Sequence, residues 1–70
     1  MNGDELFLFD LAEACVNSDY KFNKWNEAFK DEDNFDVLKE AISKETFDKL
    51  HEQAIKGTLN IYLQNILVMM

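Results

Sequence analysis

Residues 58–70 read TLNIYLQNILVMM, and this stretch carries the clearest structural pattern in the chain. On a helical wheel its apolar side chains gather on one side: Leu59, Tyr62, Leu63, Ile66, Leu67, Met69 and Met70. A recurrence every three or four residues predicts an amphipathic helix, which we expect Thr58 to cap. Because Ile61 and Tyr62 favour strands, a strand over residues 59–63 is the alternative.

The same helix would carry a second apolar stripe. Ile61 and Val68 are seven residues apart and fall on the side opposite the main stripe, among amide side chains. A helix at the edge of a small domain buries one face, so a second apolar face indicates another neighbour. We therefore predict an interface that includes Ile61, Val68, Met69 and Met70, most simply in a symmetric homodimer. The competing hypothesis is a central helix that the others surround.

Outward from this segment, capping residues divide the chain into further short helices. A first helix is expected over about residues 4–17, and a second, capped by Ser18 or Asp19, runs to about Lys30. The acidic stretch from Asp31 to Asn34 ends the second helix and supplies the next cap. A third helix is expected from about Phe35 to Ile42. Ser43 would cap a fourth, which ends at Gly57 because glycine readily adopts the left-handed conformation there.

These segments predict an all-α fold, a compact bundle of four to five short helices. We expect one domain over residues 1–70, from a complete small reading frame. The apolar arc of the first helix covers more than half of its circumference and predicts that this helix is mostly buried. The terminal helices, about residues 4–17 and 58–69, are expected to form the apolar centre. The other inward positions are Phe22, Trp25, Phe29, Phe35, Leu38, Ile42, Phe47, Leu50 and Ala54.

Charge limits the partners that the chain can bind. Fourteen acidic residues face seven lysines and no arginine, which gives a net charge of −7. Such a surface repels nucleic-acid phosphates, so direct DNA or RNA binding is not expected. A protein with a basic surface is favoured instead, because attraction between opposite charges speeds the encounter.

Size and cysteine content suggest where the chain resides and what stabilises it. A core formed by 70 residues is marginal, and Cys15 is the only cysteine, so association with a partner would add burial. A lone thiol is typical of a reducing compartment. No segment has the 18 to 20 or so apolar residues of a membrane span, and the first ten residues carry acids rather than the basic start of a secretory signal. We expect a cytoplasmic location and no membrane association.

The residues that could carry chemistry lack supporting neighbours. Cys15 lies within an apolar arc, where a thiol stays protonated, and we interpret it as a core residue. His51 with Asp48 and Glu52 resembles a metal cluster only weakly, because a carboxylate-bridged site requires several such pairs, and we place His51 at the solvent edge. We expect no enzymatic activity, no metal and no cofactor.

Two further patterns resemble binding sites and are rejected. A calcium loop that starts at Asp31 would require glycine at its sixth position, where Asp36 stands, and glutamate at its twelfth, where Ile42 stands. The aromatic residues between Lys21 and Lys30 could stack on bases, but acids cancel the local lysines. We interpret these aromatic residues as core.

The acidic residues are the remaining functional candidates. Asp31, Glu32, Asp33, Asp36 and Glu40 crowd the third helix, and Glu45, Asp48 and Glu52 continue on the fourth. The function we predict is a small acidic regulator or inhibitor that occludes a surface of a larger protein, one with a basic surface, for example a protein that processes nucleic acid. The alternatives are a DNA mimic, with carboxylates in place of phosphates, and a structural homo-oligomer or assembly component. The lack of arginine and proline suggests AT-rich coding, as in a phage or mobile element.

Overall fold

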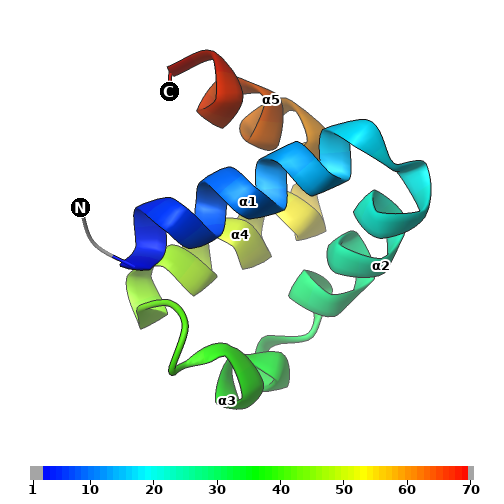
Figure 1. Ribbon diagram of the computed structural model, residues 1–70. Coiled ribbons are helices and arrows are strands. Elements are labelled where there is room, and N and C mark those ends of the chain that lie inside the picture. Colours follow the sequence, from blue (N-terminus) through cyan, green and yellow to red (C-terminus); the bar gives the residue numbers. More distant parts are fainter. Residues whose placement is uncertain (1–2, 70) are drawn as a thin grey trace.

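The fold is an all-α bundle, as the sequence predicts. The computed structural model describes residues 3–69, and within them the chain forms five α-helices and one short 3-10 helix, with no strand (Figure 1). In chain order they are α1 (Gly3–Asn17), α2 (Asp19–Lys30), η1 (Glu32–Asn34), α3 (Phe35–Leu38), α4 (Lys44–Lys56) and α5 (Leu59–Met69). The strand alternative for residues 59–63 is wrong, because these residues belong to α5.

Two serines begin helices where the sequence predicts that they do. The Ser18 hydroxyl accepts a hydrogen bond from the backbone amide of Lys21 at 3.3 Å, and the Ser43 hydroxyl accepts one from the amide of Thr46 at 3.3 Å. Both serines have extended backbone angles, as N-cap residues do. Each side chain therefore satisfies a backbone donor that the first helical turn leaves unpaired.

Gly57 ends α4 in the left-handed conformation, with φ of 77°. Its amide donates to the carbonyl of Ala54 at 3.3 Å, and the amide of Thr58 donates to the carbonyl of Gln53 at 3.0 Å. This pair of bonds is the Schellman pattern, which satisfies the last carbonyls of a helix. The Thr58 hydroxyl donates to the Gln53 side chain at 2.6 Å, so it joins α5 to the end of α4.

The third helix is much shorter than predicted. The α3 helix ends at Leu38 rather than Ile42, and the amides of Ala41 and Ile42 both donate to the Leu38 carbonyl, at 2.8 and 3.0 Å. This turn lets Ser43 take the extended conformation that starts α4. The predicted inward position of Ile42 is nevertheless confirmed, because the turn buries its side chain.

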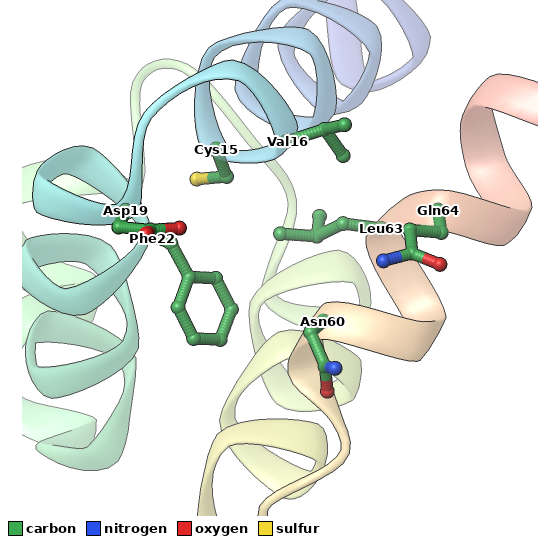
Figure 2. Close-up of a pocket in the computed structure, with 7 residues that line it drawn as sticks. All are labelled: Cys15, Val16, Asp19, Phe22, Asn60, Leu63 and Gln64. Carbon is green, nitrogen blue, oxygen red and sulfur yellow. The ribbon is translucent and has the colours of Figure 1, made fainter.

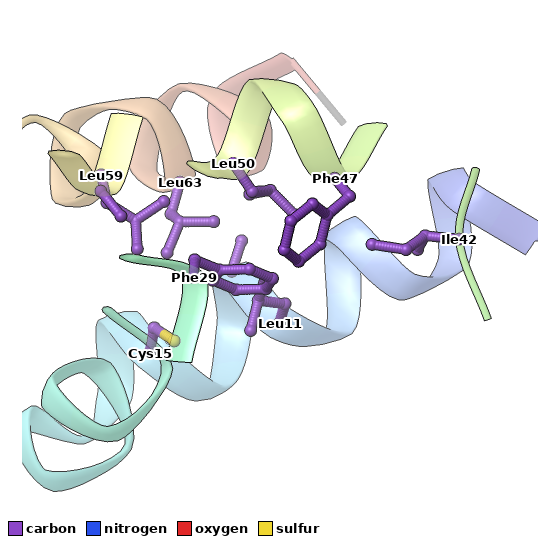
Figure 3. Close-up of a cluster of buried hydrophobic side chains, with 10 residues drawn as sticks. Leu11, Cys15, Phe29, Ile42, Phe47, Leu50, Leu59 and Leu63 are labelled. Atoms are coloured by element: carbon purple, nitrogen blue, oxygen red, sulfur yellow. The ribbon is translucent and has the colours of Figure 1, made fainter. Parts of the chain in front are cut away.

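The core gathers side chains from α1, α2, α4, α5 and the turn before α4. The buried residues are Leu11, Ala12, Cys15, Phe29, Ile42, Phe47, Leu50, Ala54, Leu59 and Leu63. Figure 3 shows the rings of Phe29 and Phe47 within this cluster, with Ile42 directed toward Phe47. The terminal helices α1 and α5 supply half of these buried residues, and α4 contributes as many as α1, so α4 joins them in forming the apolar centre.

The first helix is less buried than its composition predicts. Leu6 is 53% exposed and Val16 is 46% exposed, because the neighbours of α1 cover only part of its circumference. Figure 1 shows α1 between α5 on one side and α3 on the other. Cys15 near the end of α1 and Leu63 in the first half of α5 line the same hollow. Leu8 and Ile66 line another, so the two helices are antiparallel.

Asp4 joins the start of α1 to the start of α4, a contact between residues far apart in the sequence. Its carboxylate accepts the Ser43 amide at 3.1 Å, the Ser43 hydroxyl at 2.7 Å and the Thr46 hydroxyl at 2.7 Å. These hydrogen bonds, the Ser43 side chain first, lower the pKa of Asp4 from its usual value. The ionised carboxylate is therefore stabilised in the folded chain.

Asp4→Asn should lower the melting temperature, and the loss should depend on pH. A carboxyl group whose pKa is lower in the folded than in the unfolded chain stabilises the folded state when it is ionised. This stabilisation is complete above the pKa of the unfolded chain, and it is lost as pH falls through the pKa of the folded chain. The difference from wild type should be constant above about pH 5 and should shrink as pH falls below about 4, the ordinary aspartate pKa, toward the lowered pKa of Asp4 in the folded chain. Circular dichroism melts from pH 2 to 7 measure it, with Asp10→Asn on the same helix as the control. A difference that is independent of pH would contradict the role of Asp4.

Candidate functional site

The five predicted acidic residues all lie exposed in one short part of the structure. We call residues 31–40 the acidic segment; it comprises η1, α3 and their flanking residues. Asp31, Glu32, Asp33, Asp36 and Glu40 supply five negative charges and Lys39 supplies one positive charge. The segment therefore has a net charge of −4, more than half of the −7 of the whole chain.

Ion pairing separates the acidic segment from the acids of α4. The α4 carboxylates each pair with a lysine on the same helix, as Lys44–Asp48 at 2.7 Å, Lys49–Glu45 at 3.7 Å and Lys56–Glu52 at 2.7 Å. No carboxylate of the acidic segment pairs with a lysine in the part of the chain that the structure describes. The two groups of acids thus differ: those of α4 are locally neutralised, and those of residues 31–40 are not.

An apolar hollow lies against the acidic segment. It has a volume of about 200 Å³ and is lined by Trp25, Ala28, Asn34, Val37 and Leu38. Val37 directly follows Asp36 and is 79% exposed. The segment therefore offers a partner both unneutralised carboxylates and an apolar contact.

Hydrogen bonds and ring packing hold the acidic segment in place. The Asp31 carboxylate accepts the amide of Asp33 at 3.0 Å, which caps η1. The Asn34 side chain donates to the carbonyl of Ala28 in α2 at 2.7 Å. The ring of Phe35 lies 5.4 Å from that of Phe47 in α4, between centroids. The segment is thus attached to both α2 and α4.

The predicted interface residues of α5 point away from the core. Ile61 is 55% exposed, Val68 84% and Met69 82%, while Met70 lies outside the described residues. A groove of about 500 Å³ runs beside them between α1 and α5, lined by Glu5, Leu8, Tyr62, Asn65, Ile66 and Met69. Most of these side chains are apolar, so this surface is suited to contact with another apolar surface.

Cys15 is buried, and burial raises the pKa of its thiol, which nearby Lys21 opposes. Figure 2 shows it at the end of α1, at a hollow of about 260 Å³ that Phe22 of α2 and Leu63 of α5 also line. His51 does not line this hollow. The structure therefore does not bring the two together as a nucleophile and a base would require.

His51 is partly buried, at the edge of the core. Its Nδ1 lies 2.7 Å from the Phe29 carbonyl oxygen, and because that oxygen can only accept, Nδ1 carries the proton. The imidazole also stacks on the ring of Phe47, with 6.2 Å between centroids. The sequence indicates this contact with Phe47, because His51 follows the inward-facing Phe47 by four residues and so lies on the same face of the helix.

The suggested metal cluster does not form around His51. Asp48 pairs with Lys44 and Glu52 pairs with Lys56, and no group of three potential metal ligands lies together within residues 3–69.

The predicted aromatic face of α2 packs inward: Phe29 is buried, and Trp25 contacts both Phe29 and Phe7, at 5.4 and 6.0 Å between ring centroids.

The described surfaces are those of a small helical protein with an acidic segment and an apolar helix face. None of its helices within residues 3–69 has the length and apolar character needed to cross a membrane. No protein-family model, curated protein or solved structure matches the chain.

The Cys15 thiol should react slowly in the folded protein. Burial limits access and raises its pKa, so little thiolate is available. We expect modification by a thiol-specific reagent at pH 8 to be at least about tenfold slower than in urea. Absorbance of the released chromophore measures the rate. A native rate equal to that of the unfolded chain would contradict the buried position.

His51→Phe should destabilise the fold by about 1 kcal/mol, because it keeps a ring beside Phe47 but leaves the Phe29 carbonyl without its donor. His51→Asn, which retains a donor near the Nδ1 position, should restore part of that hydrogen bond while losing the ring contact. Urea unfolding measures both free energies. Wild-type stability in His51→Phe would show that the hydrogen bond contributes nothing.

Proposed function

We propose that this chain is a small acidic regulator or inhibitor that docks on a basic surface of a larger protein and occludes it. The observation that carries the proposal is the set of unneutralised carboxylates around exposed Val37 in the acidic segment. Opposite charge draws a basic partner toward this segment. Val37 and the hollow beside it then supply apolar contact at short range.

Charge distribution supports this segment over the acids of α1 and α4 as the docking surface. The α1 helix also has a net charge of −4, but over fifteen residues rather than ten, and its Asp4 carboxylate already accepts hydrogen bonds from Ser43 and Thr46. The α4 acids and their lysines cancel locally, so α4 adds little to the field that a partner meets. The net charge of −4 within ten residues produces a concentrated negative potential. Surface charge of this kind mainly accelerates association, and added salt screens it over about 8 Å at physiological ionic strength.

The attachment of the acidic segment supports binding without a large entropic loss. Asn34 fixes it to α2, and Phe35 fixes it to α4. A surface that is already ordered loses little conformational freedom when a partner docks. The segment thus serves as a preformed negative surface.

A DNA mimic is the second form that this function could take, and the same carboxylates would then stand in for phosphates. The concentration of unneutralised acids in residues 31–40 favours a local patch over an array spread along several helices. Competition separates the two: a mimic is displaced from its partner by duplex DNA, whereas a regulator that binds elsewhere is not. A nucleic-acid-processing partner and a phage or mobile-element origin belong to this proposal as expectations.

Neutralising the acidic segment should slow association with the partner. In Glu32→Gln/Asp33→Asn/Asp36→Asn we expect an association rate about tenfold lower at low salt and a dissociation rate changed by less than about twofold. The matched control, Glu45→Gln/Asp48→Asn/Glu52→Gln, removes three carboxylates that pair with lysines and should change association less. The partner is first captured from a host lysate, and surface plasmon resonance at two salt concentrations then gives both rates.

Equal slowing in the two triple variants would contradict the proposed docking surface, because net charge alone would then explain the effect. Capture that is as strong with the acidic-segment variant as with wild type at both salt concentrations would also contradict it. Circular dichroism confirms that each variant is folded before its rates are compared.

A further inference from the structure

The α5 helix differs from every other long helix of the chain in carrying no charge. Its eleven residues, LNIYLQNILVM, include neither an acidic nor a basic side chain, although the chain has a net charge of −7. By contrast, α1 carries four carboxylates and no lysine. The exposed apolar stripe thus lies on a long helix that has no charged side chain.

The exposed stripe has a regular spacing. Ile61, Asn65, Val68 and Met69 stand at i, i+4, i+7 and i+8, so they share one side of the helix. All four are exposed. Beside them runs the groove between α1 and α5, which Asn65 and Met69 line together with Glu5 and Leu8 of α1.

We propose that this stripe packs against the same stripe of a second copy of the chain, antiparallel about a two-fold axis near Asn65. In this arrangement Ile61 of one copy meets Met69 of the other, because positions that pair across the axis are equidistant from residue 65. The axis brings the two Asn65 amides together, and each can donate to and accept from the other.

Charge identifies the occupant of this surface as a second copy. A basic partner meets one carboxylate here, that of Glu5 in the groove, whereas two copies with a net charge of −7 repel each other less across α5 than across α1 or the acidic segment, each of which carries −4. A polar amide at the centre of an apolar stripe also fixes the alignment of two helices, as a buried asparagine does in coiled coils. The inference does not depend on the proposed function, since it uses a different surface.

The small size of this interface sets the affinity that we expect for the dimer. A helix of eleven residues is about 16 Å long, so the stripe and groove form a small interface. A standard stable interface buries about 800 Å² on each partner, and the described chain exposes 4737 Å² in all. We therefore expect reversible self-association in the micromolar range rather than a permanent dimer.

Sedimentation velocity of the full chain from low micromolar to millimolar concentration tests the proposal. Asn65→Asp places two like charges at the axis and should raise the dimer dissociation constant by at least about tenfold. The matched control is Asn60→Asp, the same change at another exposed position of α5, which lines the hollow near Cys15 instead of the groove. It should leave the constant within about twofold of wild type.

Salt dependence distinguishes this contact from docking on a basic partner. Added salt screens the repulsion between two acidic bodies, so the wild-type dimer should tighten as salt rises, whereas docking on a basic protein should weaken. A wild-type monomer over the whole concentration range would overturn the proposal, even if a different protein binds α5. Equal weakening by Asn65→Asp and Asn60→Asp, or a dimer that salt disrupts, would overturn it as well.

Discussion

The ring of Phe47 in α4 contacts the ring of Phe29 in α2 and that of Phe35 at the start of α3, with centroids 5.9 and 5.4 Å apart. His51 stacks on the same ring and donates to the Phe29 carbonyl, so α2 and α4 are joined by both apolar and polar contacts. Complete burial of a phenylalanine stabilises a fold by about 1.5–3 kcal/mol, a large share for a small domain with no disulfide. The acidic segment keeps its position because Phe35 packs on Phe47.

Charge is divided unevenly over this scaffold. Net charge is −4 in α1 and −4 in residues 31–40, +1 in α2, and zero in both α4 and α5. The net charge of α4 is zero because its three carboxylates pair with three lysines, whereas that of α5 is zero because the helix has no charged side chain. Two surfaces with opposite character result, and Figure 1 shows them on opposite sides of α1. One is suited to a basic partner, and the other to the uncharged helix of a second copy.

Local signals in the sequence predicted the helices, and contacts between distant residues account for what they missed. The caps at Ser18 and Ser43 and the stop at Gly57 depend on neighbouring residues, so they could be read directly. The early end of α3 could not, because it follows from where the chain must turn for Ser43 to reach Asp4, 39 residues away. For the candidate sites, the sequence identified the acids and the apolar stripe. The α4 ion pairs could also have been predicted, because Lys44–Asp48, Glu45–Lys49 and Glu52–Lys56 are each four residues apart on one helix. What the sequence could not show is that no lysine from another element of the described chain reaches the carboxylates of residues 31–40, since that depends on the tertiary fold.

The central claim is that the acidic segment and α5 are separate contact surfaces with different partners. Amide chemical shifts of the ¹⁵N-labelled protein test this residue by residue, first on dilution and then on titration of a dilute sample with a lysine-rich peptide. We predict that dilution moves the resonances of α5 and of Leu8, which lines the groove beside it, and that the peptide moves those of residues 31–40. Peptide-induced shifts centred on α5 or on the paired acids of α4 would contradict it.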